Sequence, residues 1–293
     1  MGEAGITRRD ALVAAGTVGA VGAGALGFAG VIGLVSESEQ AVTTLVAARV
    51  PAPTPADDPD AAAWDDAPEL VVPLLAQQLV PPSLDTLGVS DLRVRAVHDG
   101  TRIAFRLAWE DATVDDLDGI DAFHDAVAVM VPAGGAAKPA ITMGAPGAPV
   151  HIFQWRATWQ RDIAAQGKTG VDQIYPRVVH DVMPDDLLPP ETAGLYWVGR
   201  AAGNPLSQTT RTTPVEQVVA EGFGSTTHLP ETDALGRGLH DGSGWRVSLG
   251  YPAFGKNLAP PAAVAFAVWL GSQRNRGGRK HYADWVPLRV EQR

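Results

Sequence analysis

The chain of 293 residues contains no cysteine. This absence excludes disulfide bonds, thiolate zinc sites, cysteine-held iron–sulfur clusters, a cysteine nucleophile and covalently attached c-type haem. Basic side chains are also scarce, with 23 Lys and Arg against 33 Asp and Glu and a formal charge of −10. Sequence-independent nucleic-acid binding depends on cations that neutralise phosphates. We therefore expect no nucleic-acid partner.

The motifs of several enzyme classes are missing as well. The chain has neither a phosphate-cradling GxxxxGK[ST] loop nor a GxGxxG turn between a strand and a helix. The segment Gly222-Phe223-Gly224-Ser225 lacks the GxSxG spacing of a nucleophile elbow. The seven histidines show no HxH or HExxH spacing for a metal. We accordingly expect no catalytic residues in this chain.

Five aspartates follow one predicted strand, at positions 111, 115, 116, 118 and 121. A solvated loop is the simpler interpretation of this acidic run. A calcium-binding loop is the alternative, although the regular spacing of oxygen ligands is missing.

The N-terminus has the pattern of an export device. Arg8 and Arg9 precede an uncharged run over residues 11–36 that is rich in Ala, Gly and Val. Paired arginines before such a run indicate twin-arginine export, and hence a periplasmic or extracytoplasmic location. The run is also long enough for a membrane anchor, which is the alternative. We divide the chain into a signal or anchor over 1–36, a Pro- and Ala-rich linker over 37–63 and one domain over 64–293.

The mature chain is predicted to be an all-β sandwich with long loops. Apolar side chains alternate over residues 92–97 and 103–109, and Asp99-Gly100 between them is typical of a hairpin turn. Further strands are expected over 126–131, 150–155, 245–249 and 264–270, the last of them buried on both faces. Residues 213–220 are predicted to form a short helical turn. Residues 160–212 form a loop-rich insert, which we interpret as functional or as a partner surface.

Two segments carry the strongest functional signal, the sequence MGAPGAPVHIFQW over 143–155 and the strand AFAVW over 265–269 with RNRGGRK over 274–280. With these segments the chain resembles the haem b-binding gamma subunits of type II molybdoenzymes in the dimethyl sulfoxide reductase family. That group includes ethylbenzene dehydrogenase, dimethyl sulfide dehydrogenase, selenate reductase and chlorate reductase. The resemblance extends over about residues 64–290, and the long insert departs from the shorter members.

The resemblance implies a non-covalent haem b with an axial methionine and an axial lysine. Met143 matches the family motif, and we choose Lys280 as the second ligand. Lys256, His151 and His281 remain alternatives for that position. A lysine ligand must be neutral, which requires burial to lower its pKa.

Other residues near these segments are predicted to complete the haem pocket. Trp155, Phe266 and Trp269 are expected to form apolar walls. Arg276 and Arg279 are expected to pair with the haem propionates, because guanidinium groups bind carboxylates in a bidentate manner.

The resemblance implies an exported b-type cytochrome subunit. It would relay single electrons between an iron–sulfur subunit and a soluble or membrane redox carrier, while a molybdopterin subunit performs the catalysis. The alternative from another class is a secreted carbohydrate-binding β-sandwich without haem, because eight tryptophans are enough to line a sugar-binding face.

Overall fold

The computed structural model describes residues 44–133, 138–167, 177, 197–208, 210–230, 232–254 and 261–292. The predicted signal or anchor over 1–36, most of the 160–212 insert and Lys256 lie outside these ranges. Across the described ranges, none of the helices has the length and apolar character needed to cross a membrane.

Strands dominate the described residues. The strands are β1 (Leu45–Arg49), β2 (Leu70–Pro73), β3 (Leu75–Ala76), β4 (Asp91–His98), β5 (Arg102–Glu110), β6 (Ala126–Pro132), β7 (Val150–Arg156), β8 (Val215–Ala220), β9 (Thr227–His228), β10 (Leu235–His240), β11 (Gly244–Pro252), β12 (Ala263–Trp269), β13 (His281–Tyr282) and β14 (Val286–Val290). The α-helices are α1 (Ala157–Ala164) and α4 (Val198–Ala201), and the short 3-10 helices are η2 (Ala62–Asp66), η4 (Pro205–Ser207) and η5 (Gly271–Gln273).

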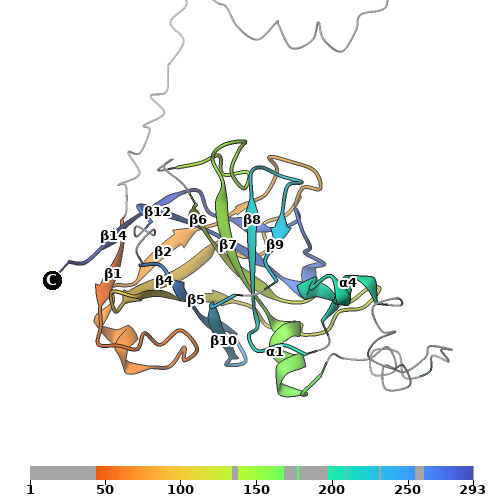
Figure 1. Cartoon of the computed structure of the whole chain (residues 1–293), viewed down its shortest axis with the longest axis horizontal. Helices are drawn as coiled ribbons and strands as arrows, with labels where there is room; N and C mark the ends of the chain where they lie inside the picture. Colours follow the sequence, from red (N-terminus) through yellow and green to blue (C-terminus); the bar gives the residue numbers. More distant parts are fainter. Residues whose placement is uncertain are drawn as a thin grey trace, which may run out of the picture. The chain divides into compact units, whose positions relative to one another are not determined.

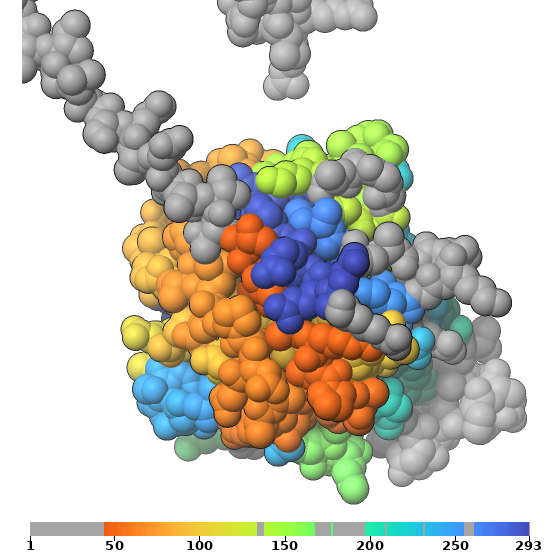
Figure 2. Space-filling model, turned by 90° about the vertical axis from the view of Figure 1, so that its left-hand side faces the viewer, coloured from red at the N-terminus to blue at the C-terminus, as the bar shows by residue number. Residues whose placement is uncertain are grey.

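The described strands form one curled sheet with the order β10-β11-β5-β4-β1-β14-β12-β6-β7-β8-β9 (Figure 1). Most neighbours are antiparallel, but β1 runs parallel to both β4 and β14. Figure 2 shows β1 in red-orange beside the dark blue C-terminal strand. Strand β1 therefore joins the two halves of the sheet.

The predicted hairpin is confirmed as β4 and β5. Gly100 has a φ of +92°, a conformation that glycine adopts without steric cost. The Asp99 carboxylate accepts hydrogen bonds from the backbone N–H groups of Thr101 and Arg102, at 2.8 and 2.9 Å. The turn residues thus fix the register in which the alternating apolar side chains enter the core.

Aromatic side chains hold the two halves of the sheet face to face. Phe153 of β7 stacks on Tyr251 of β11 with ring centroids 4.0 Å apart. Trp155 meets Trp245 edge-on at 5.0 Å. Every residue of β12 is buried, as expected for a central strand. The all-β class is confirmed, although the two facing layers belong to one continuous sheet.

Two expectations about local structure are wrong. Residues 45–49 fall in the predicted linker, yet they form β1 at the centre of the sheet, so the folded domain begins before residue 64. Residues 215–220 form strand β8 instead of a helical turn, and they pair with β7 along its whole length. Pairing with a neighbouring strand has overridden a weak local preference in both segments.

Trp155 is expected to contribute strongly to stability, because its side chain is fully buried between β11 and Gly238, where an added Cβ would lie 2.4 Å from the indole ring. We predict that Trp155→Ala lowers the free energy of unfolding by about 3–5 kcal/mol. Phe223→Ala, at a side chain that is 62% exposed, should change it by less than about 0.5 kcal/mol. Urea denaturation followed by circular dichroism measures both, and equal losses would contradict the prediction.

Candidate functional site

A cavity lies on the face of β12, β6, β7 and β8 that points away from the core. These four strands are neighbours in the sheet (Figure 1). Successive side chains of a strand point to opposite faces. In β7, Phe153 and Trp155 pack in the core, whereas Ile152, Gln154 and Arg156 line the cavity. The cavity floor is therefore the outer face of the same strands that build the core.

The volume of this cavity is about 340 Å³, within the range of small-molecule sites. Its walls are mostly apolar, and we call it the apolar cavity. Its lining side chains come from five strands, one turn and the segment after β12, and they include Met130, Met143, Ile152, Gln154, Arg156, Glu216, Val218, His228, Trp269 and Lys280.

Met143 enters the apolar cavity from a strained turn. Its φ is +68°, which is uncommon for a residue other than glycine. Gly144 follows with a φ of +83°, and a Cβ there would lie 2.6 Å from the carbonyl oxygen of Ala148. The Met143 carbonyl accepts a hydrogen bond of 2.8 Å from the N–H of Gly222. Strain of this kind persists only where the surroundings enforce it, and it is concentrated at functional sites.

Lys280 enters the same cavity from the segment that follows β12. Its backbone carbonyl accepts a 3.0 Å hydrogen bond from the N–H of Gln77. The Gln77 amide also donates to the carbonyl of Gly278 at 2.8 Å. The Lys280 ammonium lies 5.4 Å from the centroid of the Trp269 ring. The structure thus brings Met143 and Lys280, which are far apart in the sequence, into one cavity.

The Lys280 side chain is half-buried, and its ammonium has no carboxylate partner among the described residues. Burial lowers its pKa from 10.5 to about 8, because the charged form loses hydration. The ring of Trp269 compensates only part of that loss. Lys280 is therefore a nitrogen donor that can be deprotonated at small cost.

A paired acid forms one polar edge of the apolar cavity. The side chain of Glu216 is fully buried, and one of its carboxylate oxygens accepts a hydrogen bond from Arg156. The other carboxylate oxygen is bonded to Nδ1 of His228. Arg156 also donates to the side-chain oxygen of Gln154 at 3.2 Å. These groups come from β7, β8 and β9, and sequence reasoning missed them because no local motif links positions 60 residues apart.

A second, more polar cavity of about 630 Å³ adjoins the first, and we call it the polar cavity. Gln154, Arg156, Trp269 and Gly277 line both cavities. Charged side chains are concentrated in the polar cavity, namely Asp118, His124, Arg156, Asp162, Arg211 and Arg276. The two cavities together offer an apolar compartment and an adjoining cationic edge.

Several predicted site residues lie elsewhere. Trp155 belongs to the core face of β7, so the expectation that it lines the pocket is wrong. His281 is fully buried, accepts a hydrogen bond from the Gly88 N–H at 2.9 Å, and does not line either cavity. His151 stacks near Phe153 on the same core-facing side of β7. Neither histidine is placed to replace Lys280.

The other residues predicted to complete the haem pocket lie partly in the cavities and partly outside them. Trp269 lines both cavities. Phe266 also lines the apolar cavity, while its ring packs against Phe105 in the core. Arg276 lines the polar cavity, whereas Arg279 is not among the described residues that line either cavity. The two arginines pair as an isolated bridge in one turn, and only the first faces the site.

The described residues form an all-β protein with an apolar cavity and an adjoining polar cavity. Residues 61–191 match the sequence family described as ethylbenzene dehydrogenase. The chain is 26% identical over 235 residues to a Haloferax mediterranei protein named for a respiratory nitrate reductase heme subunit, ORF7. That match covers 78% of this chain and 66% of the relative, slightly less than two thirds of its length.

A second relative is the chlorate reductase subunit gamma of Ideonella dechloratans, 26% identical over 246 residues, 80% of each chain. These matches confirm the resemblance to the gamma-subunit family. A solved Bacteroides uniformis structure described as carbohydrate-binding overlaps 85% of this chain and 92% of its own, with a TM-score of 0.40 and 9% identity. No functional argument rests on a likeness at that level.

The buried Lys280 should make the stability of the ligand-free protein depend on pH. Its folded pKa of about 8 lies below the ordinary value of 10.5. Between these values the unfolded chain binds more protons than the folded one, so the free energy of unfolding rises with pH. We predict that Lys280→Met raises the free energy of unfolding by about 1–3 kcal/mol near pH 7. The variant should also lose most of the increase in this free energy that the wild type shows between about pH 7 and about pH 9.5.

Urea denaturation at the two pH values tests this prediction. Lys138→Met, at an exposed lysine, should keep the wild-type slope. An unchanged slope in Lys280→Met would show that the amine does not carry the effect.

Proposed function

We propose that this protein is the haem b-binding, electron-transfer subunit of an exported molybdenum oxidoreductase complex. The observation that carries the proposal is the convergence of Met143 and Lys280 on one mostly apolar cavity. The names of the two relatives, a heme subunit and a gamma subunit of reductases, support it.

The donors in the apolar cavity fit an iron porphyrin. A thioether and an amine are both neutral ligands, and the chain has no cysteine to which haem could be attached covalently. The apolar walls suit the macrocycle, and the buried Lys280 amine has no carboxylate partner in the described chain that would hold it protonated. Met143 and Lys280 are the residues that would hold the iron.

A haem whose two axial positions are filled by protein transfers single electrons and has no open position for a substrate. The role of Met143 is to present its sulfur, which favours the reduced metal. Lys280 must arrive as the neutral amine, and the burial that lowers its pKa to about 8 makes that form accessible. The chain then has no chemical step of its own, in keeping with an electron-transfer role.

The polar cavity would receive the two carboxylates of the haem. Arg276 lines it, and Arg156 lies at the boundary between the two cavities. Arg156 is paired with Glu216 and Arg211 with Asp162. Among the described arginines of this lining, that leaves Arg276 available for a propionate. A guanidinium pairs with a carboxylate through charge-assisted hydrogen bonds.

The partners and location follow from the same proposal. Electrons would pass between an iron–sulfur subunit and a soluble or membrane redox carrier, and a molybdopterin subunit would perform the catalysis. The paired Arg8 and Arg9 support export by the twin-arginine route. The N-terminal run would serve as the signal or as a membrane anchor.

Replacing either proposed ligand should change the spectrum of the purified full-length chain. We predict that Met143→Leu and Lys280→Leu each abolish the low-spin signal in low-temperature electron paramagnetic resonance, because each replaces a ligand with a side chain that cannot bind iron. Met130→Leu, a thioether in the same cavity, should keep the wild-type signal.

Two results would refute the ligand assignment or the proposal. An unchanged low-spin signal in both ligand variants would refute the assignment. A colourless wild-type chain, expressed with haem supplied and retained on polysaccharide, would favour the carbohydrate-binding alternative.

Arg276 offers a second test that does not depend on the iron ligands. We predict that Arg276→Gln accelerates haem transfer to apomyoglobin about 2- to 5-fold, as expected for the loss of one partly exposed ion pair. Arg279→Gln, three residues away in the same turn, should leave the rate unchanged. Equal rates for the two variants would remove Arg276 from the site.

A further inference from the structure

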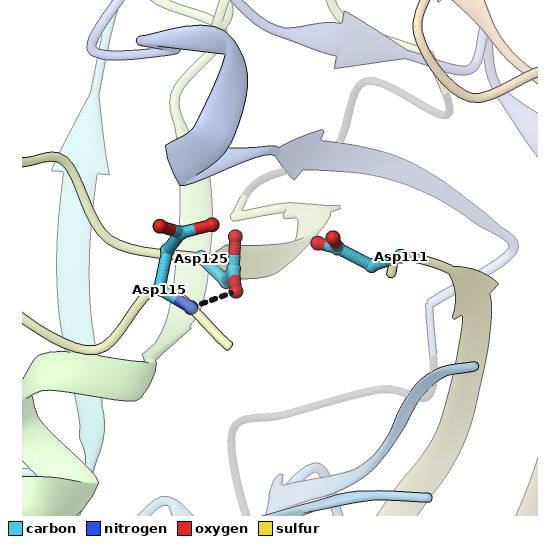
Figure 3. A group of neighbouring side chains, drawn as sticks. All are labelled: Asp111, Asp115 and Asp125. Carbon is cyan, nitrogen blue, oxygen red and sulfur yellow. Dashed lines mark hydrogen bonds between the residues drawn. The ribbon is translucent and has the colours of Figure 1, made fainter. Parts of the chain in front are cut away.

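Three aspartates gather at the end of the sheet beyond β5 and β6. Asp111 follows β5, Asp125 precedes β6, and Asp115 lies in the loop that connects these strands. One carboxylate oxygen from each lies within 4.8 Å of the others (Figure 3). The sequence alone favoured a solvated loop here, but Asp111 and Asp125 are buried.

Backbone and side-chain donors hold the innermost carboxylate in place. Asp125 is fully buried, and its Oδ1 accepts a 2.8 Å hydrogen bond from the N–H of Gly271. Its Oδ2 accepts from the N–H of Asp115 at 2.8 Å and from the Trp245 indole at 3.0 Å. Asp125 is therefore a preorganised acceptor group, fixed from three sides.

Asp111 has an oxygen that the described chain leaves unpaired. Its side chain is 8% exposed, and Oδ2 is buried without a hydrogen-bond partner among the described residues. Figure 3 shows the Asp111 carboxylate pointing toward Asp125. Oδ1 is satisfied by the N–H of Thr113 at 3.1 Å. A buried carboxylate oxygen without a donor is costly, and a bound cation would remove that cost.

The charges of the cluster are also unbalanced. In the described part of the chain, none of the three carboxylates forms an ion pair with Arg, Lys or His. The cluster brings the buried carboxylates of Asp111 and Asp125 close together, where like charges repel each other. Mutual repulsion of this kind disappears when a cation lies between the carboxylates.

We propose that Asp111, Asp115 and Asp125 form a binding site for Ca²⁺. An all-oxygen donor set selects a hard cation. Ca²⁺ accepts irregular arrangements of carboxylates and waters, whereas Mg²⁺ demands a near-octahedral site and retains most of its own water. Asp111 also lines a hollow of about 720 Å³, which provides a route of entry. The proposal is independent of the haem assignment.

The cation would join parts of the fold that are distant in sequence. The cluster links the ends of β5 and β6, and through Asp125 it reaches Gly271 after β12 and Trp245 on β11. Binding to the folded state alone stabilises that state by mass action. We therefore assign the site a structural role.

Thermal unfolding of the chelator-treated full chain tests the site. Ca²⁺ at about 100 times its dissociation constant should raise the melting temperature by about 5–10 °C. Asp111→Asn and Asp115→Asn should each abolish most of that shift. Asp121→Asn is the matched control, because Asp121 lies in the same loop but pairs with Arg274, and it should keep the full shift.

Terbium luminescence provides a second readout that does not depend on the variants' stability. Trp245 lies close enough to sensitise Tb³⁺ bound beside Asp125, and we expect emission on tryptophan excitation that Ca²⁺ displaces. Absence of both the thermal shift and the emission in the wild type would overturn the proposal. Retention of the shift in Asp111→Asn and Asp115→Asn would overturn the assigned ligands, and an equal shift with Mg²⁺ would overturn the assignment to calcium.

Discussion

Packing between the two halves of the curled sheet determines which side chains lie on its outer face, where the apolar cavity is. The stacked pair Phe153–Tyr251 and the edge-on pair Trp155–Trp245 hold β7 against β11. Since side chains alternate along a strand, the packing of Phe153 and Trp155 in the core decides which residues of β7 reach the cavity. A slip of one residue would exchange the two sets, so that the rings of Phe153 and Trp155 would face the cavity. The site is thus a consequence of the core register.

Two ionisable groups of this cavity, Glu216 and Lys280, differ in whether the described residues compensate their charge. Glu216 is fully buried but is bonded to Arg156 and His228, so its charge is compensated within the chain. Lys280 lies in the same cavity with its ammonium over the ring of Trp269, and the described residues offer it no paired carboxylate. Burying an unpaired charge is unfavourable unless something else in the functional state repays it. The contrast singles out the amine as the group that a ligand would complete, which is the physical reason for favouring a bound prosthetic group over an empty surface.

Parts of this architecture were accessible from sequence, and the reasons differ from element to element. The β4–β5 hairpin was predictable because alternation and the Asp99-Gly100 turn agree, and β12 because a continuous apolar run suits a strand buried on both faces. Strand β1 was missed since its Ala-rich sequence beside prolines carries no alternation. Trp155 was assigned to the wrong face because a strand pattern does not say which side is the core. Met143 and Lys280 came from family resemblance, and only the structure brings them together.

The segment between β12 and β13 connects the cavity to the rest of the fold. At its start, the Gly271 N–H is bound by the buried Asp125 carboxylate. At its end, the Lys280 carbonyl is bound by Gln77, whose side chain also binds the Gly278 carbonyl. A ligand held within a few tenths of an ångström needs supporting contacts of this kind on both sides. The segment that carries the amine is therefore anchored at both ends, at Gln77 in the cavity wall and at the aspartate cluster beyond it. Because Asp125 binds the N–H of Gly271 at the start of this segment, the three carboxylates help to fix the segment that carries Lys280.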